Sequence, residues 1–400
     1  MGISNLSRYV VVGVTGALLA GCGGSQPPLS PSPDRLTVQN AHAETTYNIL
    51  HEFGVLPGDG KNPSAELINV KGTLYGTTVG GGSHIYGTVF SIKPNGDETV
   101  LHSFGARRDG ANPMAGLLNV KGTLYGTTAG GGAKGGGTVF SITQSGTEKI
   151  LYSFDSSNRI HRQPDGANPV AGLTNVDGTL YGTTIAGGSH KCDTEDYCGT
   201  VFSITTDGNF KVLHNFGARN IDGVNPAAAL VNVNGTLYGT TSGGGKYYGG
   251  TVFSITTAGK YHTLYSFGPG ECPATALIDV EGTLYGTTSG CGRGGTVFSL
   301  TTGGTLKTIF SFSGRDGSNP RAGLIDVKGV LYGTTAIGGA KDRGTIFSVT
   351  AGGEEMVLHS FRAGGGVNPR AGLLEVDGTL YGTTYGSIDE THGNVFSLKP

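Results

Sequence analysis

Short runs of Thr, Val, Tyr, Phe and Leu alternate with glycine-rich turns along most of the chain, and no apolar period of 3.6 residues emerges. This pattern predicts repeating units of four strands. Residues 115–120 exemplify the first strand, in which small residues precede aliphatic ones. An Xaa-Gly turn leads to Thr-Leu-Tyr-Gly-Thr-Thr, a glycine-rich loop to Thr-Val-Phe-Ser-Ile, and a further turn to Ile-Leu-Tyr-Ser-Phe. Turns such as Asp177-Gly178 and Asn234-Gly235 are typical of type I′ hairpins, so the chain is predicted to be all-β and antiparallel.

The second strand recurs seven times, with one-residue variation, at intervals of 47 to 57 residues, a period typical of propellers and solenoids. Its tyrosines are Tyr75, Tyr125, Tyr181, Tyr238, Tyr285, Tyr332 and Tyr381. An isolated outer strand, residues 48–53, precedes the first unit, and the last unit ends after its third strand, residues 394–398. These fragments complete one blade, so we predict a seven-bladed β-propeller of four-stranded antiparallel blades over residues 45–400, closed by the N-terminal outer strand joining the C-terminal three strands. A solenoid would need polar capping repeats, and none is visible.

Composition agrees with stacked sheets. Glycine accounts for 74 of 400 residues, which allows bulky Tyr75 and Phe90 to alternate with Gly76, Thr77 and Ser91 where both faces of a sheet are covered. Charged residues make up only 14% and the net charge is −2, so no basic field is available to bind nucleic acid. Trp, the best side chain for stacking on sugars or anchoring an interface, is absent.

The first 44 residues predict export. Arg8 precedes an apolar run, residues 9–19, which is too short for a membrane span and typical of a secretory signal peptide. The run ends in Leu-Ala-Gly-Cys22, which resembles the lipobox of bacterial lipoproteins. That resemblance implies a signal peptide over residues 1–21, lipid attachment at Cys22, a Pro/Ser-rich tether over residues 22–44, and anchorage in the cell envelope at the outer membrane. The alternative is an ordinary signal cut at residues 41–43, but this site lies too far beyond the apolar run.

The repeats themselves resemble the choice-of-anchor tandem repeat proteins called GloVer and, more distantly, kelch-type propellers. The resemblance covers roughly residues 46 to 399 and rests on the seven near-copies of Thr-Leu-Tyr-Gly-Thr-Thr. It implies the propeller fold and a surface anchor, and it implies no established enzymatic activity.

An exported chain favours disulfides, and four cysteines remain once Cys22 is set aside. Cys192 and Cys198 lie in one glycine-rich loop, without the CxxC spacing of a metal site. Cys272 and Cys291 lie in loops that emerge on the same face of an antiparallel blade. We therefore expect the bridges Cys192–Cys198 and Cys272–Cys291.

Asp-Gly-Xaa-Asn-Pro precedes the first strand of five units, and its Asp and Asn side chains form a possible ligand face. They are Asp59, Asn62, Asp109, Asn112, Asp165, Asn168, Asp222, Asn225, Asp316 and Asn319. Such oxygens bind Ca²⁺ or sugar hydroxyls, but Asp and Asn also cap turns through the backbone, and multiple carboxylates are lacking. We favour the structural interpretation.

Two further sets of equivalent residues are candidate sites. His51, His102, His214 and His359 share one outer-strand position, but Tyr152, Tyr265 and Phe310 occupy it in other units, so an aromatic packing role is expected rather than a metal cluster. A polar ring in the inner strands could line an axial channel. It consists of Asn69, Asn119, Asn175, Asn232, Asp279, Asp326 and Glu375.

Catalytic motifs are absent: there is no GxSxG elbow, HExxH helix, Walker loop or Asp-rich calcium loop. The sequence therefore predicts no catalytic residue, no metal, no cofactor and no nucleic-acid partner. We expect a monomer, held at the membrane by its lipid, that acts as a binding or scaffolding module for a protein or glycan. The alternatives are a propeller enzyme, such as a polysaccharide lyase or hydrolase with unusual His, Glu or Arg near the axis, and a structural envelope protein without a specific ligand.

Overall fold

The computed structural model describes residues 45–105, 108–156, 163–190, 198–219, 221–273, 275–292, 294–387 and 392–400. The predicted signal peptide, Cys22, the tether and Cys192 lie outside these residues. One compact unit spans Ala43–Pro400. No helix among the described residues is both long enough and apolar enough to cross a membrane.

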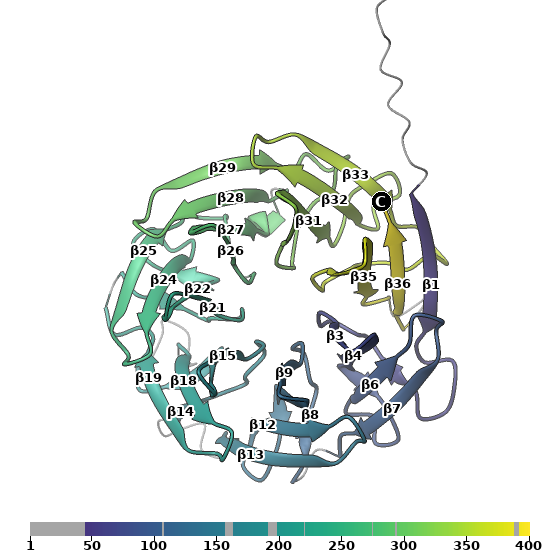
Figure 1. Cartoon of the computed structure of the whole chain (residues 1–400). Coiled ribbons are helices and arrows are strands. Elements are labelled where there is room, and N and C mark those ends of the chain that lie inside the picture. Colours follow the sequence, from purple (N-terminus) through teal and green to yellow (C-terminus); the bar gives the residue numbers. More distant parts are fainter. Residues whose placement is uncertain are drawn as a thin grey trace, which may run out of the picture. The chain divides into compact units, whose positions relative to one another are not determined.

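Seven antiparallel sheets, or blades, surround a common axis, as Figure 1 shows. Blade 1 contains β3 (Ile68–Val70), β4 (Thr73–Thr78), β6 (Thr88–Ile92) and β7 (Glu98–Ser103); blade 2 contains β9 (Leu118–Val120), β10 (Thr123–Thr128), β12 (Gly135–Thr143) and β13 (Glu148–Asp155). Blade 3 contains β15 (Thr174–Val176), β16 (Thr179–Thr184), β18 (Thr200–Thr205) and β19 (Phe210–Asn215); blade 4 contains β21 (Val231–Val233), β22 (Thr236–Thr241), β24 (Thr251–Thr256) and β25 (Tyr261–Ser266). Blade 5 contains β26 (Ile278–Val280), β27 (Thr283–Thr288), β28 (Thr296–Thr301) and β29 (Leu306–Ser311); blade 6 contains β30 (Ile325–Val327), β31 (Val330–Thr335), β32 (Thr345–Thr350) and β33 (Glu355–Ser360). Blade 7 contains β34 (Leu374–Val376), β35 (Thr379–Thr384), β36 (Asn394–Lys399) and β1 (Thr46–Glu52).

Short two-stranded ladders link the loops at one end of several blades. They are β2 (Gly60–Lys61) with β5 (Gly80–Gly81), β14 (Gln163–Ala167) with β17 (Ala186–Gly188), and β20 (Gly223–Val224) with β23 (Gly243–Gly244). In blade 2 the equivalent pair, β8 (Gly110–Ala111) with β11 (Gly130–Gly131), joins the sheet of the blade because β11 also pairs with β12. In blade 5 the corresponding loop holds the 3-10 turn Gly290–Gly292.

The ring closes as the chain ends predict. β1 pairs antiparallel with β36, from Thr46 opposite Lys399 to Glu52 opposite Asn394. Figure 1 shows β1, the first described strand, on the outside of the C-terminal strands β36 and β35. The seven-bladed propeller closed by its N-terminal outer strand is therefore confirmed, and the open edge of β36 is covered.

The repeated Thr-Thr dipeptide joins the blades. In each blade the first Thr donates its hydroxyl hydrogen to a main-chain carbonyl of the following blade, as from Thr77 to Ala115 at 3.0 Å. The series ends with Thr383 of blade 7, which donates to Ala65 at the entry to blade 1 at 3.4 Å. The same arrangement shortens the first strand of the unit. Residues 115–117 were predicted to be part of it, but β9 begins at Leu118, since the carbonyl of Ala115 faces blade 1 instead of a strand of its own sheet.

Both faces of each sheet are buried, which explains the glycine within Thr-Leu-Tyr-Gly-Thr-Thr. A Cβ atom on Gly76 would lie 2.6 Å from Cζ of Phe90 and 2.8 Å from Cδ2 of Leu67. The same close approach recurs at the equivalent glycine of every blade. Because Phe90 is fully buried, neither ring nor backbone has room to retreat.

The inner hairpins have the predicted type I′ turns. Lys71 and Gly72 both have positive φ, at 54° and 84°. The amide of Gly72 donates to Oδ1 of Asn69 at 2.8 Å. Equivalent bonds form at Asn119, Asn175, Asn232, Asp279, Asp326 and Glu375, so all seven members of the polar ring cap a turn.

The predicted bridge Cys272–Cys291 is confirmed, with the two Cα atoms 6.0 Å apart. Cys272 stands where the other blades have the Asn of Asp-Gly-Xaa-Asn-Pro, and it keeps the positive φ, 49°, of that position. Cys198 is buried and disulfide-bonded. Because its expected partner Cys192 lies outside the described residues, that pairing stays a prediction.

Candidate functional site

The asparagines of Asp-Gly-Xaa-Asn-Pro serve as links between blades. Asn62 has a φ of 58°, a conformation that Asn tolerates better than most residues. Its side-chain amide donates to the carbonyl of Tyr385 in blade 7 at 2.9 Å. Asn112 and Asn168 bind the preceding blades in the same way, through the carbonyls of Val79 and Ala129. At Asn225 and Asn319 the backbone amides donate to the carbonyls of Cys198 and Gly294, which lie in loops of the preceding blades.

The aspartates of the motif hold the turns that follow the outer strands. The backbone amide of Gly54 donates to Asp59 at 2.7 Å, that of Gly105 to Asp109 at 2.9 Å, and that of Ser313 to Asp316 at 2.8 Å. Each aspartate lies at a different boundary between blades. The five therefore do not converge on one surface site, and a ligand-binding role for them stays a prediction.

Sequence reasoning missed the polar partners of the outer-strand aromatics. Nε2 of His51 lies 3.5 Å from Asp59, Nε2 of His102 lies 3.1 Å from Asp109, and Nε2 of His214 lies 3.2 Å from Asp222. The hydroxyl of Tyr152 donates to Asp165 at 2.8 Å. A comparison of the units would have found this signal, because four of the five units with the motif Asp have His or Tyr at the outer position.

The aromatic packing expected for these positions is present as well. The ring of His214 stacks on Tyr261 of the next blade at 3.9 Å between centroids, and His359 stacks on Tyr47 at 4.0 Å. Each of the four histidines also stands edge-on to the phenylalanine two residues later, as His51 does to Phe53 and His102 to Phe104. At His214 and His359 this position therefore also joins the outer strands of adjacent blades.

A rim pocket breaks the repeat symmetry between blades 6 and 7. It encloses about 530 Å³, and its lining includes Arg321, Arg343, Arg370, Asp342 and Tyr385. Arg321 and Arg370 directly follow the proline that begins an inner segment. The equivalent residues in the other units are Ser64, Met114, Val170, Ala227 and Ala274. The two arginines are therefore the only charged residues that the sequence has at this position.

Local contacts orient the two arginines. The guanidinium of Arg370 lies over the ring of Tyr385, 4.0 Å from its centroid. With the Asn368 amide turned so that its oxygen faces Arg370, that oxygen accepts from Nη2 at 3.0 Å and from Nε at 3.2 Å. Nε of Arg321 donates to Asn319 at 3.4 Å. Burial, and then the charge of Arg321, lower the pKa of Arg370, so two cations are held near one another in this pocket.

The rim pocket adjoins the axial channel, because Arg321 and Arg370 line both. The channel cavity encloses about 290 Å³ between the inner segments of all seven blades. Its walls consist mainly of Ala and Gly, and Glu66 of blade 1 is the one acidic side chain among the described residues that line it. Glu66 retains contact with solvent in the channel, while enclosure by the walls raises the pKa of its carboxyl above the ordinary value.

A second hollow of about 470 Å³ lies against β19 and β25, near His214 and Asp222. There the His–Asp pair is already formed and His214 is covered by Tyr261. The rim pocket leaves more bonding capacity open, because Oγ of Ser387 finds no hydrogen-bond partner among the described residues. Of the sequence-predicted ligand residues, Asn62 and Asn319 line the rim pocket. We therefore place the candidate site there.

Sequence reasoning did not single out Arg321, Arg370 or Glu66. A residue-by-residue alignment of the seven units shows the signal, since charge appears at positions that are otherwise small or apolar. Charge near the axis in particular blades is also what the enzyme alternative requires.

A search of curated proteins found no match to the chain. Solved structures to which the chain is similar include two putative 6-phosphogluconolactonases. That from Bacteroides uniformis shares 16% identity at a TM-score of 0.49, over 78% of this chain and 88% of its own. That from Bacteroides fragilis shares 19% identity at a TM-score of 0.48, over 78% of this chain and 86% of its own. The family model of the Gloeobacter/Verrucomicrobia repeat matches residues 36–194, 159–293 and 274–400, and so the chain belongs to this repeat family.

Proposed function

We propose that the protein is an envelope-anchored binding module whose rim pocket binds a glycan bearing carboxylate groups. The supporting observation is the pair Arg321 and Arg370, two cations at positions where the other five blades have uncharged residues. Three arginines and a single carboxylate, that of Asp342, line the pocket among the described residues, so its lining carries an excess of positive charge. Guanidinium groups bind planar carboxylates through paired hydrogen bonds.

A saccharide fits the remaining lining better than a compact inorganic anion does. Asn62, Asn319 and Ser387 offer donors and acceptors suited to hydroxyl groups, and Tyr385 contributes an aromatic body. The pocket also continues toward the channel mouth, since the two arginines border both spaces. An elongated polymer can thus bind at the rim without entering the channel.

The arginine pair provides the test of binding. A charge-assisted hydrogen bond contributes about 1.5–3 kcal/mol, so we expect Arg321→Ala and Arg370→Ala each to weaken binding about 10- to 150-fold. The probe is an array of uronic-acid oligosaccharides printed beside their methyl esters, followed by titration of the best acid. The wild-type protein should bind acids and not esters.

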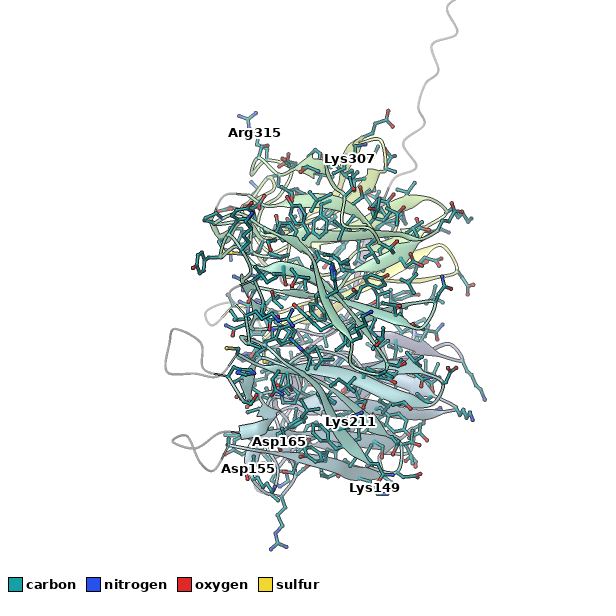
Figure 2. The ribbon with its side chains drawn as sticks, turned by 90° about the vertical axis from the view of Figure 1, so that its left-hand side faces the viewer. Lys149, Asp155, Asp165, Lys211, Lys307 and Arg315 are labelled. Carbon is teal, nitrogen blue, oxygen red and sulfur yellow. A yellow bond between two sulfur atoms is a disulfide. The ribbon has the colours of Figure 1, made fainter. Side chains whose placement is uncertain are left out.

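The matched control is Arg315→Ala. Arg315 is exposed, and Figure 2 shows it pointing away from the ring. We expect this variant to bind like the wild type. Equal binding of acids and esters, or an equal loss in the Arg315 variant, would contradict the proposal.

The enzyme alternative rests on Glu66, an acidic side chain that lines the channel at a position where the other units have Gly or Ala; such a carboxyl could serve as a proton donor. It predicts that the bound oligosaccharide is shortened on incubation and that Glu66→Gln abolishes the cleavage. The binding proposal predicts that the oligosaccharide keeps its length on incubation with the wild type and with the Glu66→Gln variant. Mass spectrometry of the recovered oligosaccharide distinguishes the two.

The anchor is proposed from the lipobox at Cys22. Cys22→Ala removes the thiol that would receive diacylglycerol, so the variant should remain uncleaved or leave the membrane fraction. The measurements are the intact mass and the membrane share of the protein in a bacterial host. An unchanged mature mass together with full membrane retention would rule out lipidation at Cys22.

A further inference from the structure

Two neighbouring blade boundaries each gather one histidine and two carboxylates. The first, which we call the seam cluster, consists of His51 of β1, Asp59 of the connection that follows β1, and Glu98 of β7. The other, which we call the second cluster, consists of His102 of β7, Asp109, and Glu148 of β13. Within each, one nitrogen or oxygen atom per residue lies within 4.8 Å of the others.

We propose that the seam cluster and the second cluster each bind one Zn²⁺ ion through these three side chains, with water in the fourth position. The sequence predicts no metal, because Tyr or Phe replaces the histidine in other units. The three ligands of each cluster come from separate segments, so no short motif contains them.

The separations fit a tetrahedral ion. Zn–N and Zn–O bonds of about 2.0–2.2 Å place neighbouring ligand atoms about 3.3–3.5 Å apart. Nε2 of His51 lies 3.5 Å from Oδ1 of Asp59, and Nε2 of His102 lies 3.1 Å from Oδ2 of Asp109. The glutamate side chain, with three rotatable bonds, can close the remaining distance.

The supports around the ligands resemble those of metal sites. Backbone amides of Gly54 and Gly105 donate to the two aspartates and orient them. Phe53 and Phe104 stand edge-on to the two imidazole rings. The positions of the aspartate and histidine are therefore set before any ion binds.

The glutamates supply an independent observation. Oε1 of Glu98 and Oε1 of Glu148 are buried and have no hydrogen-bond partner among the described residues. An ionised carboxylate left in this condition is costly, and a cation beside it removes the cost. Two carboxylates and one neutral imidazole also balance the charge of a divalent ion.

The chain contains its own comparison at the boundary of blades 5 and 6. Glu355 occupies the same strand position there, its Oε1 is likewise without a partner, and Asp316 is nearby in the motif. Phe310 replaces the histidine. Imidazole is the ligand that favours transition metals over Mg²⁺ and Ca²⁺. This boundary lacks an imidazole at that position, so it should not bind Zn²⁺.

Protons should compete with the ion. In the seam cluster, burial opposes protonation of His51, but the hydrogen bond and charge of Asp59, with Glu98 and Glu52, raise the His51 pKa. Burial raises the pKa of Glu98 to about 7, with His51 opposing and Asp59 adding to the shift. Metal ligands bind in their deprotonated forms, so the affinity of this site for the ion should fall as the pH is lowered.

The test is zinc stoichiometry in the full-length, tag-free protein after chelation and dialysis against ZnCl₂. We expect two ions per chain by mass spectrometry of the metal. Glu98→Gln and Glu148→Gln should each remove one ion, and the double variant should bind none. Co²⁺ should replace Zn²⁺ with visible absorption bands of a tetrahedral site, which adventitious surface binding does not produce.

Glu355→Gln is the matched control and should retain both ions. His51→Phe reproduces a side chain that the fold already accepts at Phe310, so its expected loss of one ion does not depend on misfolding. No bound zinc in the wild type, equal loss in the Glu355 variant, or full binding by the double variant would overturn the proposal. None of these outcomes depends on the rim pocket.

Discussion

A chain that begins at Gly54 and lacks β1 is expected to lose most of its folding stability or to aggregate. The deletion removes the ladder to β36 and leaves that strand as an open edge. It also removes Tyr47, Leu50 and Phe53, which pack against blades 6, 7 and 1. Full burial of such a side chain contributes about 1.5–3 kcal/mol; Phe53 is fully buried, and Tyr47 and Leu50 are half-buried. The combined loss is comparable with the whole stability of a typical domain, about 5–15 kcal/mol.

A chain that begins at Thr45 is the control for this prediction. It retains β1 and nearly all of the compact unit, Ala43–Pro400, so its melting temperature should equal that of the full chain. Thermal melts of both shortened chains, followed by circular dichroism, make the comparison. Equal melting temperatures for the two would mean that β1 does not hold the ring closed.

Removal of the Cys272–Cys291 bridge is expected to cost about 3 kcal/mol, since the bridge closes a loop of roughly 18 residues that the unfolded chain would otherwise explore freely. We expect Cys272→Ser/Cys291→Ser to melt about 5 °C below the wild type without reductant. The backbone carbonyl of Cys272 still accepts from Ser289, so the loop retains its local fold.

A second variant separates the cross-link from the backbone conformation of Cys272. Its φ of 49° is the one at which the other blades have asparagine. Cys272→Asn/Cys291→Ser should therefore melt slightly above the double serine variant and still below the wild type. A melting temperature unchanged in both variants would show that the bridge adds no stability.

Contiguous stretches of the sequence determined the fold. The type I′ turns depend on adjacent pairs such as Lys71-Gly72, and the four strands of each unit follow from alternation over a few residues. The unmatched strands at the two ends predicted closure of the ring, and β1 on β36 confirms it. The Cys272–Cys291 bridge could be predicted for the same reason, since both loops emerge on one face of one blade.

The candidate sites depend on contacts that cross blades, which the order of residues does not show. Glu98 meets His51 and Asp59 only because blade 1 packs against the strand that closes blade 7. Arg321 and Arg370, one unit apart in sequence, border one pocket because successive blades bring equivalent positions together at the rim. The repeats by themselves determined the local strands and the number of blades. The tertiary structure alone determines which charged side chains of different units lie together in the clusters and in the rim pocket, because their proximity depends on packing between units.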